Sequence, residues 1–250
     1  KKPRSARNLS GYLKIMAESM LHIQKLCAYY GDFQALFDLD MHVNQGEVVA
    51  IIGANAAGKT TLMRSIAGLS GDQSKKIYYR GERIGALRAD QVAGKGIALV
   101  PEGRQLFSSL TVEENLIIGG QIGRKGMWSL PSVYQLFPVL EERRAILATE
   151  LSGGQQQMAA IARALMANPK LILFDEISLG LAPVVIKTIY DALPIIIREG
   201  VSVMIVEQDI SKALQFSSRF YCLQKGRVAL EGLSKTAQRD DISRAYFGVH

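Results

Sequence analysis

The 250-residue sequence contains few cysteines and no long apolar run. Cys27 and Cys222 are far apart and each lies in an apolar context, so they form neither a metal motif nor a redox motif. We expect both thiols to be reduced and buried. A membrane-spanning helix needs about 20 consecutive apolar residues. The longest uncharged stretch, Met127 to Leu140, is interrupted by Pro131 and Pro138, so we expect no span in this chain.

Two further features are missing. The short apolar stretch in the first 30 residues is broken by Glu18 and Lys25, which is not the pattern of a secretory signal. No basic stripe is interleaved with aromatic residues in the body of the chain, so we expect no nucleic-acid partner. The sequence also has no internal repeat and no low-complexity segment.

The net charge of +7 is concentrated at the N-terminus, because residues 1–25 hold six basic residues and only one acidic residue. We interpret residues 1–19 as a basic extension. It is either a solvated tail or a segment that touches anionic lipid headgroups, where each Lys or Arg contributes about 1 kcal/mol.

Short apolar runs alternate with helical periodicity through most of the chain. We expect buried strands at 48–52, 97–100, 171–174, 201–206 and 220–223, and helices at 155–167, 184–198 and 210–216. Buried strands that alternate with helices are typical of a parallel sheet covered by helices. The sequence therefore predicts an α/β fold with a mainly parallel sheet.

Two other segments complete this organisation. Alternating patterns at 21–26 and 35–43, separated by a turn at 30–32, predict an N-terminal antiparallel β part. The stretch 103–148 contains no convincing strand and is interpreted as part of a helical insertion. We expect one domain over residues 20–250, with a helical subdomain at about 103–167.

The strongest local motif is G-x-x-x-x-G-K-T, placed between a predicted strand and a predicted helix. In this setting the loop N–H groups and the helix N-terminus cradle phosphate oxygens. Lys59 would reach the β- and γ-phosphates, and the hydroxyl of Thr60 would bind Mg²⁺. The candidate nucleotide-binding residues are Gly53, Ala54, Asn55, Ala56, Ala57, Gly58, Lys59, Thr60 and the adjacent Thr61.

A second motif, L-I-L-F-D-E, is an apolar strand that ends in two carboxylates. Many strands end in acids only because they reach solvent. The G-x-x-x-x-G-K-T motif, known as a P-loop, lies in the same chain and favours a functional interpretation. Asp175 would hold Mg²⁺, and Glu176 would act as the general base toward the attacking water.

A third motif, L-S-G-G-Q, precedes the helix predicted at 155–167. It fits a glycine turn followed by a serine cap, but it also leaves bare N–H groups at the positive end of the helix dipole. Since the P-loop already binds phosphate, this second phosphate site suggests that the γ-phosphate is shared between two copies. The candidate residues are Ser152, Gly153, Gly154 and Gln155.

These three motifs, in this order and spacing, resemble the ATP-binding domain of ABC proteins over about residues 20–250. The resemblance implies a P-loop NTPase core, ATP and Mg²⁺ as ligands, and ATP hydrolysis. It also implies that Tyr30 stacks on adenine. Glu102 takes the place of a conserved loop glutamine beside the γ-phosphate and metal, and Gln208 takes the place of a switch histidine. Thr60, Glu102 and Asp175 are the candidate metal ligands, and Glu176 and Gln208 the candidate catalytic residues.

Several segments, including V-P-E-G-R and V-E-Q, are similar to the ATP-binding subunits of branched-chain amino acid importers. That branch implies a second ATP-binding subunit, in a homo- or heterodimer, together with membrane permease subunits and, indirectly, a soluble solute-binding protein. It also implies a location on the cytoplasmic face of the inner membrane. The chain would energise import of branched-chain or other hydrophobic amino acids.

Two positions depart from the family pattern. Ala56 stands where a glycine is usual, which would strain the loop if φ is positive there, and Gln208 cannot carry the charge of a histidine. These departures leave a second interpretation open, in which the chain is a catalytically weak regulatory partner. A third alternative is a soluble ABC ATPase outside transport, although the chain has neither the tandem domains nor the coiled coil of such proteins.

Overall fold

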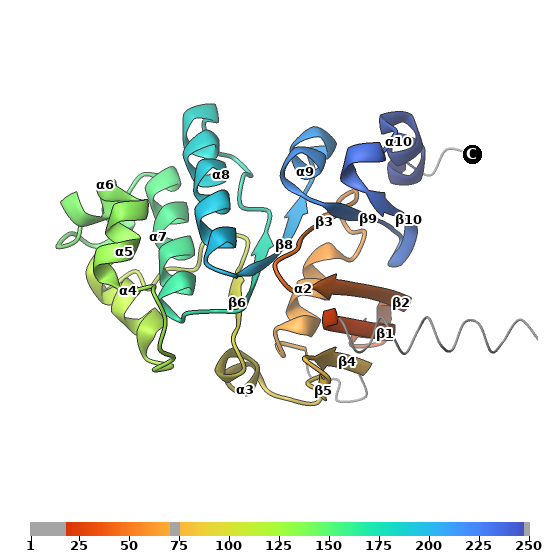
Figure 1. The fold of residues 1–250 in the computed structure, drawn as a ribbon, viewed down its shortest axis with the longest axis horizontal. Helices are drawn as coiled ribbons and strands as arrows, with labels where there is room; N and C mark the ends of the chain where they lie inside the picture. Colours follow the sequence, from red (N-terminus) through yellow and green to blue (C-terminus); the bar gives the residue numbers. More distant parts are fainter. Residues whose placement is uncertain (1–18, 71–75, 248–250) are drawn as a thin grey trace, which may run out of the picture.

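The fold is seen in a computed structural model that describes residues 19–70 and 76–247. Two sheets lie side by side, and helices cover the larger one on both faces (Figure 1). This arrangement confirms the predicted α/β class, with a mainly parallel sheet and an antiparallel N-terminal part. The basic extension predicted at 1–19 lies outside the described residues, except for Ser19, which begins the first strand.

The smaller sheet is antiparallel and has the strand order β2-β1-β4-β5. Its long hairpin, β1 (Ser19–Tyr30) and β2 (Phe33–Asn44), closes at the predicted turn, where Gly31 has a φ of 57°. Strands β4 (Lys76–Tyr79) and β5 (Glu82–Arg83) extend this sheet. Neither strand was predicted, because two to four residues show no period and these segments are not uniformly apolar.

The larger sheet has the order β10-β9-β3-β8-β7-β6, and every pairing in it is parallel except β9 with β10. Its strands are β3 (Val48–Ile52), β6 (Ile97–Val100), β7 (Leu171–Asp175), β8 (Ser202–Glu207), β9 (Arg219–Gln224) and β10 (Arg227–Leu233). The predicted strands all appear, within about two residues. The antiparallel edge strand β10 was not predicted.

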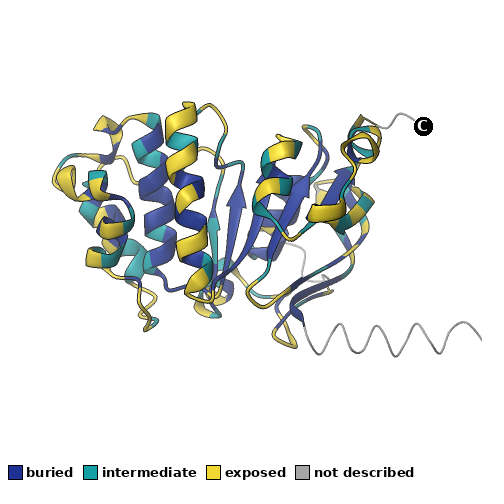
Figure 2. Cartoon of the chain, turned by 45° about the horizontal axis from the view of Figure 1, so that its top comes forward, coloured by how far each residue is buried: buried dark blue, intermediate teal, exposed yellow. Residues whose placement is uncertain are grey.

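Burial on both faces explains the continuous apolar runs. In β8, Val203 and Ile205 pack into the core cluster on one face, while Met204 and Val206 pack into the cluster on the other. Figure 2 shows this double burial of the central strands. The carboxyl ends of these parallel strands meet at one edge of the sheet, where open α/β sheets bind their ligands.

Between β6 and β7 the chain forms only helices, which gather at one end of the molecule (Figure 1). The α-helices of the described residues are α2 (Lys59–Ile66), α3 (Ala89–Gly94), α4 (Val112–Gly120), α5 (Leu130–Leu136), α6 (Pro138–Glu142), α7 (Gly153–Met166), α8 (Pro183–Arg198), α9 (Ile210–Phe216) and α10 (Arg239–Phe247). Helices α4 to α7 form the helical insertion that the sequence predicts.

One expectation about the cysteines is wrong. Both thiols are free, and Cys222 is fully buried as expected. Cys27, however, is only half-buried, and its Sγ lies 3.7 Å from Oδ1 of Asp38. Around Cys27 the neighbouring Leu26 and Ala28 are buried but Cys27 itself is not, so an apolar local context does not guarantee burial.

Among the helices of residues 19–70 and 76–247, none combines the length and the apolar character that crossing a bilayer requires.

Candidate functional site

The loop between β3 and α2 depends on glycine at two close approaches. A Cβ on Gly53 would lie 2.5 Å from the carbonyl oxygen of Leu223, and one on Gly58 would lie 2.6 Å from Cδ2 of Leu36. Gly58 also caps α2 with a φ of 101°. These contacts fix the loop ahead of the helix, so its N–H groups are preorganised at a positive helix end.

Ala56 adopts the left-handed conformation in the same loop, with a φ of 62°. The structure therefore has the positive φ that the sequence analysis considered for this position. A Cβ in this region costs about 1–2 kcal/mol, and such strain is held where the surrounding structure requires it.

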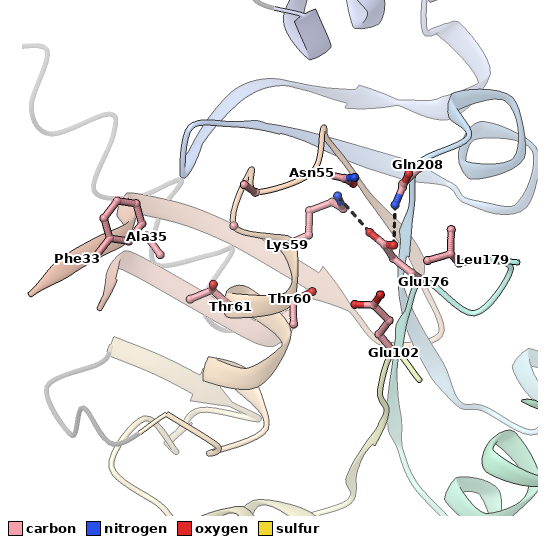
Figure 3. A pocket seen from close by; sticks show the side chains of 12 residues that line it. Phe33, Ala35, Asn55, Lys59, Thr60, Thr61, Glu102, Glu176, Leu179 and Gln208 are labelled. Atoms are coloured by element: carbon pink, nitrogen blue, oxygen red, sulfur yellow. Dashed lines mark hydrogen bonds and ion pairs between the residues drawn. The ribbon is translucent and has the colours of Figure 1, made fainter. Parts of the chain in front are cut away.

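Lys59, the first residue of α2, is buried and turned back over the loop. Its Nζ donates hydrogen bonds to the carbonyl oxygens of Gly53 (2.8 Å) and Ala54 (3.0 Å). It also lies 3.3 Å from Oε1 of Glu176 (Figure 3). Its charge is thus compensated at the point where an anionic ligand would bind.

The end of β7 brings a carboxylate beside the loop. Asp175 is 2% exposed, and its Oδ1 lies 3.4 Å from the hydroxyl oxygen of Thr60. The pKa of Asp175 is raised to about 6, chiefly by burial and in smaller part by the nearby carboxylates of Glu176 and Glu102, against the opposing hydrogen bond from Thr60 and charge of Lys59. A cation at this position would restore the ionised form.

The next residue, Glu176, meets Gln208 from the end of β8. The side-chain amide of Gln208 donates a hydrogen bond of 2.6 Å to Oε2 of Glu176, so both carboxylate oxygens are held (Figure 3). Glu176 has a φ of 52°, which is rare for a non-glycine residue. This backbone strain turns the carboxylate of Glu176 toward Lys59.

These groups line a cleft of about 480 Å³. Its lining residues are Phe33, Ala35, Asn55, Ala56, Gly58, Lys59, Thr60, Thr61, Glu102, Glu176, Leu179 and Gln208. The structure thus brings together P-loop residues, Glu176 just after β7, Gln208 just after β8 and the exposed carboxylate of Glu102 in the loop after β6. Asp175 lies beside this cleft and lines an adjoining pocket together with Thr60 and Glu102. Gly53, Ala54 and Ala57 shape the loop from behind rather than lining the cleft.

Three lining residues were not predicted: Phe33, Ala35 and Leu179. Phe33 is 70% exposed at the start of β2, and an aromatic residue just after a glycine turn was the available signal. Tyr30, the predicted adenine-stacking residue, ends β1 and pairs with Phe33 in register. The side chain of Tyr30 lies outside what the structure describes.

The L-S-G-G-Q motif begins α7, as predicted, although the helix starts at Gly153 rather than Gln155. Ser152 caps it: its hydroxyl accepts from the Gln155 N–H (3.3 Å), and the Gln155 side chain accepts from the Ser152 N–H (3.0 Å). Gly154 is buried, and a Cβ there would lie 2.6 Å from Val185. Among the described residues, none of this motif lines the cleft.

Arginines connect the loop after β6 to the first and last turns of α7. The guanidinium of Arg163 donates to the carbonyl oxygens of Gln105 (2.8 Å) and Arg104 (3.3 Å), and that of Arg104 donates to Gln156 (3.3 Å). Arg104 and Gln105 both have positive φ. The segment that carries Glu102 is therefore tied to the helix that carries Ser152.

A glycine-rich loop between a buried strand and a helix, with a buried lysine and a carboxylate pair at the neighbouring strand ends, defines a P-loop nucleotide-binding protein. Residues 36–178 match the family model described as ABC transporter, and the chain belongs to this family. As an ABC-type ATP-binding chain it is an ATPase.

The chain resembles two curated branched-chain amino acid transport ATP-binding proteins. It is 46% identical to BraG of Pseudomonas aeruginosa, over 84% of this chain and 91% of BraG. It is 34% identical to LivF of Archaeoglobus fulgidus, over 85% of this chain and 92% of LivF.

Solved structures agree with this assignment. An ATP-binding subunit of an ABC transporter superposes with a TM-score of 0.80 and 26% identity, over 92% of this chain and all of that one. The ATP-binding cassette MJ0796, a dimer in a post-hydrolysis state bound to ADP and phosphate, superposes with a TM-score of 0.77 and 26% identity, over 86% of this chain and 99% of that one.

Proposed function

We propose that the chain hydrolyses ATP to energise an importer of branched-chain amino acids. The observation that carries this proposal is the position of Glu176, whose carboxylate is held between Lys59 and Gln208 at the mouth of the cleft. The names of BraG and LivF supply the solute class.

In the proposed mechanism the loop N–H groups and Lys59 bind the phosphates. Glu176 accepts a proton from the attacking water, and the Gln208 amide orients the carboxylate that takes that proton. Gln208 also offers N–H groups to the γ-phosphate, although it cannot add positive charge. The chain would therefore hydrolyse ATP slowly.

The residues at the end of β7 fit Mg²⁺. Mg²⁺ is usually held by one or two carboxylates together with substrate phosphates, rather than by an all-protein cage. Asp175 and Thr60 supply one carboxylate and one hydroxyl group for such a site. The raised pKa of Asp175 indicates a carboxylate that lacks a strong cationic partner. Glu102 supplies a further carboxylate at the rim. When bound, Mg²⁺ would neutralise charge on the phosphates.

The N-terminus of α7 would complete the site of a second subunit. The cap residues of α7 do not line this chain's own cleft. The free N–H groups of its first turn give this helix end a partial positive charge. In a head-to-tail pair, Ser152 and Gly153 of each copy would face the γ-phosphate in the other copy. The pair would be a homodimer or a heterodimer with a second ATP-binding subunit.

The permease subunits would dock in a second groove, of about 510 Å³, between α3, β6, α4 and α7. Its rim exposes Leu69, Phe107 and Ile122, each more than 40% exposed. Gln105 and Arg163 line the same groove, so an occupant would contact the loop that leads to Glu102. This arrangement would join permease movement to the cleft, at the cytoplasmic face of the inner membrane.

The test is reconstitution with the permease and the solute-binding protein in liposomes. We expect ATP hydrolysis to rise when the binding protein carries leucine, isoleucine or valine, and Phe107→Ala to reduce that stimulation. Ile117→Ala is the matched control, since Ile117 is as exposed as Phe107 but does not line the groove. Stimulation by glutamine alone would contradict the solute class.

One observation favours the regulatory alternative: the strained Ala56 combined with the uncharged Gln208. In that case the purified chain would bind ATP and hydrolyse it only when paired with a different ATP-binding subunit. Glu176→Gln in this chain, measured with that subunit present, separates the two proposals: lost turnover supports the first, and unchanged turnover supports the regulatory role.

A further inference from the structure

Glu207 is a buried carboxylate to which neither the P-loop chemistry nor the V-E-Q segment that contains it assigns a role. It ends β8 and is 3% exposed. Alternation along the strand turns it to the same face as Val203 and Ile205, under α8 and α9. Within residues 19–70 and 76–247, no lysine or arginine forms an ion pair with it, since the nearby Lys212 is paired with Asp209 at 3.5 Å.

Two hydroxyl groups hold this carboxylate. The Tyr190 hydroxyl, from α8, donates to Oε1, and the Ser178 hydroxyl donates to Oε2 at 2.9 Å. Tyr190 is itself buried and stacks on Phe216 of α9, with ring centroids 4.2 Å apart. A buried charge is tolerated only when it is well hydrogen-bonded, and here the donors come from two different segments.

Both segments lead directly to the groups that face the nucleotide cleft. Ser178 lies two residues after Glu176, and Gln208 follows Glu207 in the chain. Gln208 returns to Glu176 through the hydrogen bond of 2.6 Å. Side chains and backbone therefore form a closed ring: Glu176, Ser178, Glu207, Gln208 and again Glu176.

We propose that Glu207 is a positioning residue for ATP hydrolysis, which acts through Ser178 and Gln208 to hold the Glu176 carboxylate. The ring fixes Glu176 from two directions, since one connection runs along the loop after β7 and the other passes through the amide of Gln208. Such support matters because the rate of the reaction falls when a catalytic carboxylate is displaced from its productive position by a fraction of an ångström.

The loop after β7 adds a consequence. Ser178 begins the exposed segment that contains Leu179 and Gly180, and Leu179 lines the nucleotide cleft and is 50% exposed. A subunit that presses on this segment would shift Ser178, and through Glu207 it would shift Gln208. Glu207 thus connects an exposed contact segment to the orientation of the catalytic carboxylate.

The inference rests on the proposed role of Glu176, and a set of variants separates the two. We expect Ser178→Ala and Glu207→Gln each to lower kcat about tenfold with an unchanged KM for ATP. The double variant should be no slower than the slower single variant, because both changes break the same ring. Ser178→Thr keeps the hydroxyl and should restore most of the rate.

Ser217→Ala is the matched control, because Ser217 is a half-buried serine whose hydroxyl bonds to Ala213 and Ser234, away from the ring. It should leave kcat unchanged. Thermal unfolding of every variant reports any purely structural effect. If Ser178→Ala and Glu207→Gln lower the Tm but keep the wild-type kcat, or if their effects on kcat multiply, the positioning role is wrong. If Glu176→Gln retains full turnover, the proposed role of Glu176 fails instead.

Discussion

The nucleotide cleft and the N-terminus of α7 both have the features of a phosphate site, but they are built in opposite ways. In and beside the cleft, buried and half-buried polar groups contact one another, as Lys59 does with Glu176 and Asp175 with Thr60. At α7 the cap residue Ser152 is exposed, and the polar contacts of the cap stay within the first turn of the helix.

The difference indicates two halves of one site. The cleft supplies charged groups for phosphates, metal and water, and the helix N-terminus that its described residues contribute is that of α2. The end of α7 supplies a second helix N-terminus, whose charged neighbour is the guanidinium of Arg104. The two glycines there also differ: Gly154 is required for packing against Val185, whereas Gly153 leaves the helix end open beside Arg104.

The largest expected effect comes from a substitution in the nucleotide cleft. Glu176→Gln keeps the shape and the hydrogen bond from Gln208 but removes the base, so kcat should fall by about 10²–10⁴-fold. ATP binding should remain, and the dimer should accumulate with ATP bound. Phosphate release and bound nucleotide are the measurements. Glu199→Gln, at the exposed end of α8, is the control, and unchanged turnover in Glu176→Gln removes Glu176 from the base role.

A second prediction concerns the charge that the cleft buries. The folded protein holds the Asp175 proton up to about pH 6, whereas the ordinary pKa is 3.8. Stability should therefore fall as pH rises from about 4 to 6, and at pH 7.5 the ionised group costs up to about 3 kcal/mol. Without nucleotide, Asp175→Asn should raise the Tm at pH 7.5 by several degrees while abolishing Mg²⁺-dependent turnover.

The control for this pH effect is Asp191→Asn, which removes an exposed carboxylate from α8. Its Tm should follow the wild-type pH profile. A lower Tm for Asp175→Asn than for the wild type at pH 7.5 would show that the Asp175 carboxylate stabilises the fold, contrary to the burial argument.

A third prediction concerns a substitution at the N-terminus of α7. Ser152→Ala removes the cap, which costs about 1 kcal/mol, and should lower ATP turnover about tenfold while ATP binding to the isolated chain stays unchanged. Thr111→Ala is the matched control, because Thr111 caps α4 through the same capping box. It should lose similar stability and keep its turnover. Equal losses of turnover in both variants would show that Ser152 acts only as a helix cap and does not contribute to the ATP site.

The smallest expected effect concerns loop strain. Ala56→Gly removes a Cβ at a φ of 62° and should raise the unfolding free energy by about 1 kcal/mol or less, with ATP bound at least as tightly. Ala54→Gly, in the same loop but without positive φ, should lower stability by about 0.5–1 kcal/mol. Chemical denaturation distinguishes them, and a destabilised Ala56→Gly would show that the loop tolerates alanine without strain.

The sequence predicted the parts of this molecule whose patterns are local. The run from Val48 to Ile52, the P-loop and the acidic end of β7 all have short-range signals, and the structure has them where expected. Contacts between distant segments were not predictable. Nothing in the sequence pairs Glu207 with Ser178 and Tyr190, because these contacts depend on how the strands are ordered.

The central claim, that two chains build each ATP site, is tested most directly by the concentration dependence of turnover. The specific ATPase activity should be measured across the range in which sedimentation shows monomers converting to dimers, with the second ATP-binding subunit present if the pair is a heterodimer. The account predicts that activity per chain rises with the dimer fraction. Full specific activity at concentrations where every chain is monomeric would contradict it.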